Sequence, residues 1–331
     1  MLTLVVGIVA LALLFDFLNG MNDAANSVAT VVATGVLPPR LAVLWAAFFN
    51  FVAAFGFEVK VANTVGKGIV HPSVVEPFLV LAALVSAIIW TYLCTALGLP
   101  ISVSHAIIGA LAGAGAAKGG FGALLPQGIA KVALFIVVSP LLGMALGWLL
   151  MVLVFWLFRH TKVQKVDRVF RVGQLLSSGA YSLGHGLNDA QKTIGVITVL
   201  LYSAGYLPEF HVPVWVILAS YSTIALGTLV GGWKVVHTMG IRLTRLRPVG
   251  GFCAETAGAL SLIGASLAGI PVSTTHTIAG AIAGVGSTTR VSAVRWGVAS
   301  RIVWAWVLTL PTTALVAALT WWLVSGVRGL F

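Results

Sequence analysis

Long apolar runs, separated by short polar segments, make up most of this chain. Four stretches contain no Asp, Glu, Lys or Arg, namely 78–117, 132–158, 256–289 and 302–327. A helix needs about 20 apolar residues to cross a bilayer, so each stretch can hold a membrane-spanning helix. Membrane β-barrels show segments of about 10 residues with alternating polarity, a pattern that this sequence lacks. The pattern predicts an all-α polytopic membrane protein with about 10–12 membrane segments.

Two of the apolar runs are interrupted in a way that predicts broken helices. The first run stops at Asn19-Gly20, and the run that starts at 172 stops at Gly184-His185-Gly186. Glycine next to a polar residue favours an unwound turn, and unwound helices are common where membrane transporters bind ions. We therefore expect both helices to break at these positions.

Two shorter segments predict re-entrant hairpins. Segments 101–117 and 272–288 are each about 17 residues long and rich in glycine, and each follows a proline and has hydroxyl residues near its start. That length is short for a membrane span and typical of an arm that enters the membrane and returns. The apolar runs before them, 78–98 and 252–269, are expected to form the adjoining helices.

Composition and charge support a membrane protein and narrow its partners. The 331 residues are 59% hydrophobic and 8% charged, which excludes an ordinary soluble domain. The net charge of +11 collects between apolar runs, above all in the segment 159–171. Short basic loops stay in the cytoplasm, so we expect a multi-pass protein of the cell (plasma or inner) membrane with this loop inside, and no nucleic-acid partner. Cys94 and Cys253 indicate neither a disulfide nor a metal site.

The sequence repeats itself in two halves. Residues 19–24 (Asn-Gly-Met-Asn-Asp-Ala) match 185–190 (His-Gly-Leu-Asn-Asp-Ala), and the motif Pro-x-Ser-x-(Ser/Thr)-His occurs at 100–105 and 271–276. The other matched blocks pair Lys60 with Lys234, Gly109, Gly113 and Gly115 with Gly280, Gly284 and Gly286, and Pro140 with Pro311. Such order indicates gene duplication, with repeat 1 over 1–158, a short basic loop over 159–171 and repeat 2 over 172–331. Internal repeats are typical of secondary transporters, which bind substrate between the repeats.

The repeated hexads place carboxylates inside apolar sequence, where burying a charge has a high free-energy cost. Candidate cation ligands are Asn22, Asp23, Asn26, Asn188 and Asp189. Carboxylate and amide oxygens suit a hard cation such as Na⁺. Two alternatives stay open: the acids could take up protons instead, since burial raises the pKa of a carboxyl group, or each Asp could cap the helix that follows it.

The second pair of motifs is rich in hydroxyl groups at predicted helix starts. The candidates are Ser102, Ser104, Ser273, Thr274 and Thr275. Free backbone N–H groups and hydroxyls at a helix start form an anion site, so two such tips could surround a tetrahedral oxyanion. The alternative is that these residues only cap buried helices.

Several basic and acidic residues near these motifs are further candidates. His105 and His276 recur in the Pro-Ser-His motif, where they could bind the anion, relay protons or, most commonly, bond a backbone carbonyl. His185 stands where repeat 1 has Asn19, and Lys192 stands where it has Asn26. Glu255 has no acidic counterpart in repeat 1. A buried Lys and a buried Glu tend to pair, so we expect Lys192 and Glu255 either to neutralise each other or to let Lys192 attract the anion.

With these motifs, the chain resembles the inorganic phosphate transporter (Pit) family along essentially its whole length. The resemblance rests on the motifs at 20–26, 186–192 and 271–276. It implies symport of inorganic phosphate with Na⁺ or H⁺ through an inverted repeat, with acids and hydroxyls from both halves at one site and no other cofactor. Lys192 departs from a symmetric cation site, and the short central loop leaves no room for a large cytoplasmic domain.

Other functions stay open at this stage. Some relatives carry sulfate, but phosphate can donate a proton to a nearby acid at neutral pH and sulfate cannot, which favours phosphate. An intramembrane hydrolase would use His105 or His276 as a base and a nearby Ser or Thr as a nucleophile, and a channel would need no cation gradient. The oligomeric state is open between a monomer and a homodimer.

Overall fold

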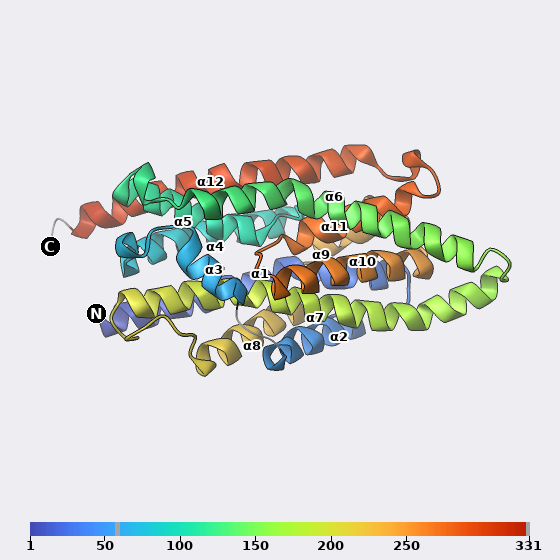
Figure 1. Ribbon diagram of the computed structural model, residues 1–331, viewed down its shortest axis with the longest axis horizontal. Coiled ribbons are helices and arrows are strands. Elements are labelled where there is room, and N and C mark those ends of the chain that lie inside the picture. The colour runs from blue at the N-terminus through green and yellow to red at the C-terminus, as the bar shows by residue number, and fades with distance from the viewer. Residues whose placement is uncertain (57–59, 329–331) are drawn as a thin grey trace.

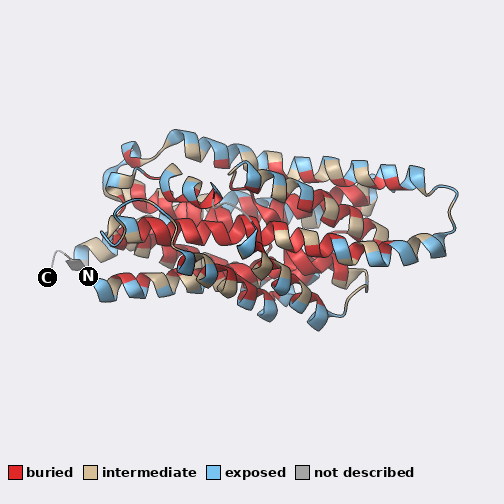
Figure 2. Ribbon diagram, turned by 60° about the horizontal axis from the view of Figure 1, so that its bottom comes forward, coloured by how far each residue is buried: buried red, intermediate tan, exposed pale blue. Residues whose placement is uncertain are grey.

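The computed structural model describes residues 1–56 and 60–328, which form twelve α-helices, and the long ones lie roughly along one axis (Figure 1). Their bounds are α1 Leu2–Ala33, α2 Pro39–Val52, α3 Lys60–Gly68, α4 Pro77–Leu97, α5 Val103–Gly119, α6 Pro126–Leu157, α7 Val163–Ser203, α8 Val214–Val230, α9 Trp233–His237, α10 Pro248–Leu267, α11 Thr274–Ser287 and α12 Trp296–Arg328. Buried residues run along the centre of the bundle, and exposed residues lie around it (Figure 2). The prediction of an all-α fold is confirmed.

Three of the four charge-free stretches, 78–117, 132–158 and 302–327, coincide with membrane-spanning candidates, and the fourth, 256–289, holds none. Within the described residues, α1, α4, α6 and α12 are long and apolar enough to cross a membrane. Two sharply bent pairs, α2 with α3 and α8 with α9, reach the same length and polarity together. The predicted 10–12 membrane segments therefore have to include bent and short helices.

The predicted breaks at Asn19-Gly20 and Gly184–Gly186 are wrong, because α1 and α7 run through them without interruption. Close packing explains the glycines instead. A Cβ atom on Gly20 would lie 2.1 Å from the carbonyl oxygen of Ile224 in α8, and one on Gly186 would lie 2.7 Å from that of Asn50 in α2. Glycine here lets two helix backbones touch.

The two Pro-x-Ser-x-(Ser/Thr)-His motifs lie at the starts of short buried helices, as predicted. Helices α5 and α11 have 17 and 14 residues, fewer than a membrane span needs. Ser102 and Ser273 are their N-caps, and each hydroxyl oxygen accepts a hydrogen bond from the backbone N–H three residues later. Each short helix follows a longer one, α4 or α10, so the hairpins expected from the sequence are present.

The short helix of each half packs on the long last helix of the other half. A Cβ atom on Gly113 of α5 would lie 2.0 Å from the carbonyl oxygen of Ala314 in α12. One on Gly280 of α11 would lie 2.0 Å from that of Pro140 in α6. The Gly-x-x-x-Gly spacing is therefore structural and interlocks the two halves.

The basic connection between the halves is shorter than expected. Only residues 158–162 lie outside helices, because α7 begins at Val163. Arg171 forms an ion pair with Asp167 one turn earlier, at 3.0 Å, a spacing that supports helix. The turn lies at the end of the molecule opposite both chain termini (Figure 1).

Candidate substrate and cation site

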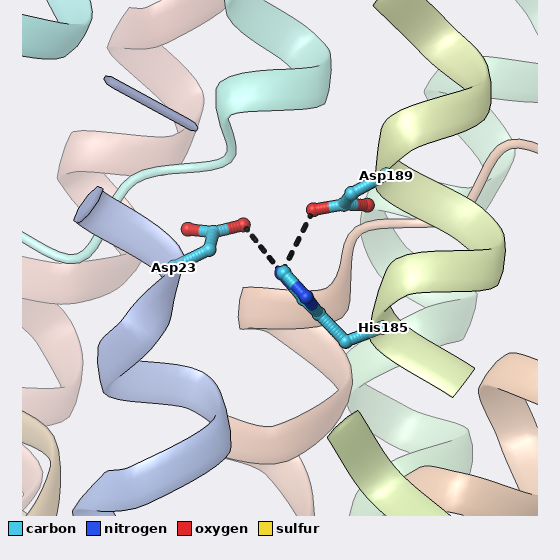
Figure 3. Close-up of side chains that lie close together, drawn as sticks. All are labelled: Asp23, His185 and Asp189. Atoms are coloured by element: carbon cyan, nitrogen blue, oxygen red, sulfur yellow. Dashed lines mark ion pairs between the residues drawn. The ribbon is translucent and has the colours of Figure 1, made fainter. Parts of the chain in front are cut away.

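The acids of the two hexads meet at the centre of the bundle. Asp23 lies on α1 and Asp189 on α7, and both are buried, with 1% and 0% of their surface exposed. His185, one turn before Asp189, points between them (Figure 3). Its Nε2 atom lies 3.3 Å from Asp189 Oδ2 and 3.8 Å from Asp23 Oδ2. The ligand atoms of these three residues lie within 4.8 Å of one another, close enough to hold a cation together.

Asn50 of α2 fixes the orientation of the His185 ring. The Nδ1 atom of His185 lies 3.0 Å from Asn50 Oδ1, and the amide of Asn50 donates to Thr228 on α8. The Nε2 atom is thereby directed at the two acids. Asn50 is a buried polar residue in an aromatic segment. This feature alone in the sequence pointed to a role for Asn50, and it did not indicate the contact with His185.

Lys192 pairs with Asp189 rather than with Glu255, so the expected pairing of Lys192 with Glu255 is wrong, and attraction of the anion by Lys192 stays a prediction. Its Nζ atom donates to Asp189 Oδ1 at 2.5 Å, to the Val272 carbonyl at 3.0 Å and to Ser104 Oγ. Lys192 and Asp189 are three residues apart on α7, so they share one face of that helix. Lys192 therefore brings a positive charge, 1% exposed, to the paired acids.

Glu255 is held by neutral donors at a separate position. Thr30 and Gln174 donate to its Oε1 atom at 2.6 and 2.9 Å, and Ser177 donates to Oε2 at 2.5 Å. These contacts join α10 to α1 and α7. These three hydrogen bonds stabilise the Glu255 carboxylate without a basic partner. Lys192 is therefore available to pair with Asp189.

Two threonines at the start of α11 contact the acids directly. Thr274 donates to Asp23 at 3.1 Å and lies 3.2 Å from Asp189 Oδ2. Thr275 Oγ1 lies 3.3 Å from Asp23 Oδ1, and Asn26 donates to Thr275 at 2.9 Å. The structure thus brings the hexad of repeat 1 and the hydroxyl motif of repeat 2 together.

The hydroxyl groups of the two Pro-x-Ser-x-(Ser/Thr)-His motifs have two kinds of contact: some cap a helix, and others contact the residues of the site. Ser102 and Ser273 accept the N–H groups of His105 and His276, at 3.3 and 3.2 Å, as the capping alternative expects. Ser104 instead faces Lys192. A capping serine still has its O–H proton available, so capping leaves an anion contact open.

The asparagines next to the acids present free oxygen atoms. Asn22 donates to Thr95 at 2.7 Å, and Asn188 donates to Ser266 at 3.3 Å. Among the described residues, the Oδ1 atom of each has no hydrogen-bond partner. These two matched oxygens are suitable ligands for a hard cation.

His105 and His276 contact each other instead of the acids. Their rings meet edge to face with centroids 4.8 Å apart, and His276 stacks on Trp306 at 3.8 Å. The Nδ1 atom of His276 lies 3.2 Å from the Ile136 carbonyl oxygen. The backbone contact expected as the commonest role is therefore present for His276.

A cavity of about 760 Å³ lies elsewhere, near the basic turn. Arginines and apolar side chains line it, and none of the predicted site residues does. The paired acids are thus buried away from it.

Comparison with known proteins gives this site its context. The model of the phosphate transporter family matches residues 19–317. The chain belongs to the phosphate transporter family. This transporter is 56% identical over 317 residues to a probable low-affinity inorganic phosphate transporter of Rhizobium meliloti, covering 96% of this chain and 95% of that protein. It is 41% identical to a probable low-affinity inorganic phosphate transporter of Bacillus subtilis, covering 98% of each.

A solved structure supports the same assignment. A sodium-dependent phosphate transporter superimposes with a TM-score of 0.91 at 27% sequence identity, over 98% of this chain and 99% of that chain. The transporter is therefore a multi-pass membrane protein that carries phosphate and is not an enzyme. The family therefore argues against the alternative of an intramembrane hydrolase. None of the relatives named above carries sulfate in its name.

Proposed function

We propose that this transporter imports inorganic phosphate together with cations, with Na⁺ as the coupling ion, by alternating access between its two repeats. The observation that carries the proposal is the meeting of Asp23 from repeat 1 with Asp189 from repeat 2 around His185. Secondary transporters bind substrate and ions where their repeats meet. The structural likeness to a sodium-dependent phosphate transporter favours Na⁺ over H⁺.

Charge balance supports the proposed coupling. Lys192 offsets Asp189, and the two acids share His185, whose Nε2 atom lies 3.3 Å from Asp189 and 3.8 Å from Asp23, so these four groups leave no surplus positive charge for an anion. A phosphate dianion added to this buried site needs positive charge, since uncompensated ions are costly in low dielectric. Na⁺ ions held by the acids and by Asn22 and Asn188 supply that charge. Each ligand then raises the affinity for the other.

The anion contacts come from both hairpins. Lys192 and the hydroxyls of Ser104, Thr274 and Thr275 surround the acids. The first N–H groups of α5 and α11 lie beside these hydroxyls and favour negative charge. In the proposal, Ser102 and Ser273 hold the two helix starts in place, and phosphate binds between them.

Burial of the site supports alternating access. Asp23, Asp189 and Lys192 are all at most 1% exposed, so neither ion nor phosphate reaches them without a movement of the surrounding helices. Placing the basic turn 158–162 in the cytoplasm puts both chain ends on the opposite side of the membrane. Import then means exposure of the site first toward that opposite side.

Ion replacement tests the proposal. Purified protein in liposomes is given labelled phosphate with an inward Na⁺ gradient, with choline at the same pH, or with an inward proton gradient alone. We expect accumulation with Na⁺ only, and no competition by excess sulfate. Accumulation driven by protons alone would overturn Na⁺ coupling, and equal flux under all three conditions would overturn symport.

A further inference from the structure

Asp16 is a buried acid that the site above does not use. It lies on α1, seven residues before Asp23, and its side chain is fully buried. In the described part of the chain, neither carboxylate oxygen has a hydrogen-bond partner. The buried basic groups nearest in the fold are occupied: Lys192 by Asp189, and His185 by the two acids and Asn50. An uncompensated carboxylate at this depth is costly, so the group needs either a proton or a counter-ion.

Two neutral side chains bring further oxygens to Asp16. Asn19 lies one turn later on α1, and Thr193 approaches from α7, one turn after Asp189. Both are buried, and the Asn19 Oδ1 and Thr193 Oγ1 atoms also lack a hydrogen-bond partner among the described residues. The two carboxylate oxygens of Asp16 therefore lie close to the Thr193 hydroxyl and the Asn19 side-chain amide, and none of the side-chain oxygens of these three residues is in a hydrogen bond of ordinary geometry within the described part of the chain.

We propose that Asp16, Asn19 and Thr193 form a second cation site, which takes Na⁺. This inference rests on the proposed Na⁺ coupling. Carboxylate, amide and hydroxyl oxygens are the ligands of hard cations, and the absence of sulfur or imidazole ligands among these three residues disfavours transition metals. One carboxylate with neutral partners balances a single positive charge. A divalent ion would leave a surplus charge in low dielectric.

The position of this site gives it a role in coupling. Seven residues of helix separate Asp16 from Asp23, a distance of about 10 Å along α1. The offset is toward the end of the molecule that holds both termini, away from the basic turn (Figure 1). With that turn in the cytoplasm, Na⁺ from outside meets this site before the paired acids. Asp189 and His185 are within electrostatic range of Asp16, so neutralising Asp16 favours an anion at the central site.

Na⁺ dependence of uptake in matched variants tests the site. Asp16→Asn keeps the shape and removes the charge, and Thr193→Val keeps the shape and removes the oxygen. We expect Asp16→Asn to raise the Na⁺ concentration for half-maximal uptake at least about tenfold, and Thr193→Val to raise it severalfold, each with a lower Hill coefficient. The KM for phosphate at saturating Na⁺ should stay within about twofold of the parent value, because the central site keeps its ligands.

Thr198→Val is the matched control for the threonine variant. Thr198 lies on the same helix and is equally buried, but its hydroxyl already donates to the Ile194 carbonyl. We expect its Na⁺ dependence to equal that of the parent protein. Thermal unfolding of each variant with Na⁺ or choline, without phosphate, shows that it is folded and measures the loss of stabilisation by Na⁺.

The outcomes separate this site from the proposed function. If the parent protein shows Na⁺-driven uptake and both variants keep its Na⁺ dependence, the second site is wrong and the proposed function stands. If Asp16→Asn changes only the pH dependence of uptake, the site takes a proton and the Na⁺ assignment is overturned. If the parent protein shows no Na⁺ dependence at all, the proposed function itself fails.

Discussion

Lys192, two residues after the second hexad, marks a large chemical difference between the two repeats, because repeat 1 has Asn26 at the matching position. It connects Asp189 on its own helix with Ser104 of α5 and with the Val272 carbonyl before α11. At the matching position, Asn26 donates only to the two threonines of α11. One half of the site therefore contributes a fixed positive charge and the other a neutral amide. In the proposed function, the anion therefore binds on the Lys192 side and Asp23 holds a mobile cation.

Lys192→Met tests the role of that fixed charge. The variant keeps the length of the side chain but leaves Asp189 without its partner, and breaking a buried ion pair costs about 3–5 kcal/mol. We expect the KM for phosphate to rise at least about tenfold and the thermal stability to fall. Uptake kinetics and thermal unfolding measure the two effects.

Lys234→Met is the control for this substitution. Lys234 matches Lys60 in the repeat, is exposed, and donates to the Ala96 carbonyl at 2.8 Å, outside the site. Its loss should leave the KM for phosphate unchanged. A folded Lys192→Met protein with an unaltered KM for phosphate would show that Lys192 serves only to pair with Asp189.

At the scale of elements, α1 presents one continuous polar stripe to its neighbours. Asp16, Asn19, Asp23, Asn26 and Thr30 follow one another at intervals of three or four residues, which is the spacing of one helix face. The stripe faces polar groups of α7, α10 and α11, which makes it tolerable inside a membrane protein. The expected break at Asn19-Gly20 divided this stripe in two, so Asp16 and Thr30 were not predicted.

The short helices α5 and α11 depend on glycine for their position. In Gly113→Ala, the added methyl group would lie 2.0 Å from the carbonyl oxygen of Ala314, so α5 must move away from α12. Overpacking of this kind costs about 1–3 kcal/mol. We expect a lower unfolding temperature and slower phosphate uptake, because Ser104 at the start of α5 moves with the helix.

Gly264→Ala on α10 is the matched control. A Cβ atom there has no heavy atom within 4 Å, and alanine favours helix over glycine by about 0.5–1 kcal/mol. Unfolding temperature and uptake should be equal to or above the parent values. Equal losses in the two variants would mean that contact with α12 is not what positions α5.

At the scale of the whole molecule, the two halves interlock rather than lie side by side. Helix α5 packs on α12, α11 packs on α6, α1 packs on α8, and α7 packs on α2. Each of these pairs joins an element of one half to an element of the other. The proposed substrate and cation site therefore lies between the halves, where the relative movement of the repeats that we propose would open it.

This interlocking also explains what the sequence could and could not predict. Apolar runs, the repeat and isolated polar residues are local features, so the all-α membrane fold, the short hairpins and the paired Asp23 and Asp189 could be predicted. Partners were not predictable, since Lys192 pairs with Asp189 and Glu255 with Thr30, Gln174 and Ser177 through contacts between distant segments. The roles of Gly20 and Gly186 were misread for the same reason, because the opposing backbones are far away in sequence.

The central claim is that Asp23 and Asp189 together couple cations to phosphate. The most direct measurement is Na⁺-driven accumulation of labelled phosphate in liposomes by Asp23→Asn and Asp189→Asn, each shown to be folded by thermal unfolding. Either substitution removes a charge that the cation needs, so we predict that each variant loses concentrative uptake. Na⁺-driven accumulation at the parent level in both variants would contradict the claim.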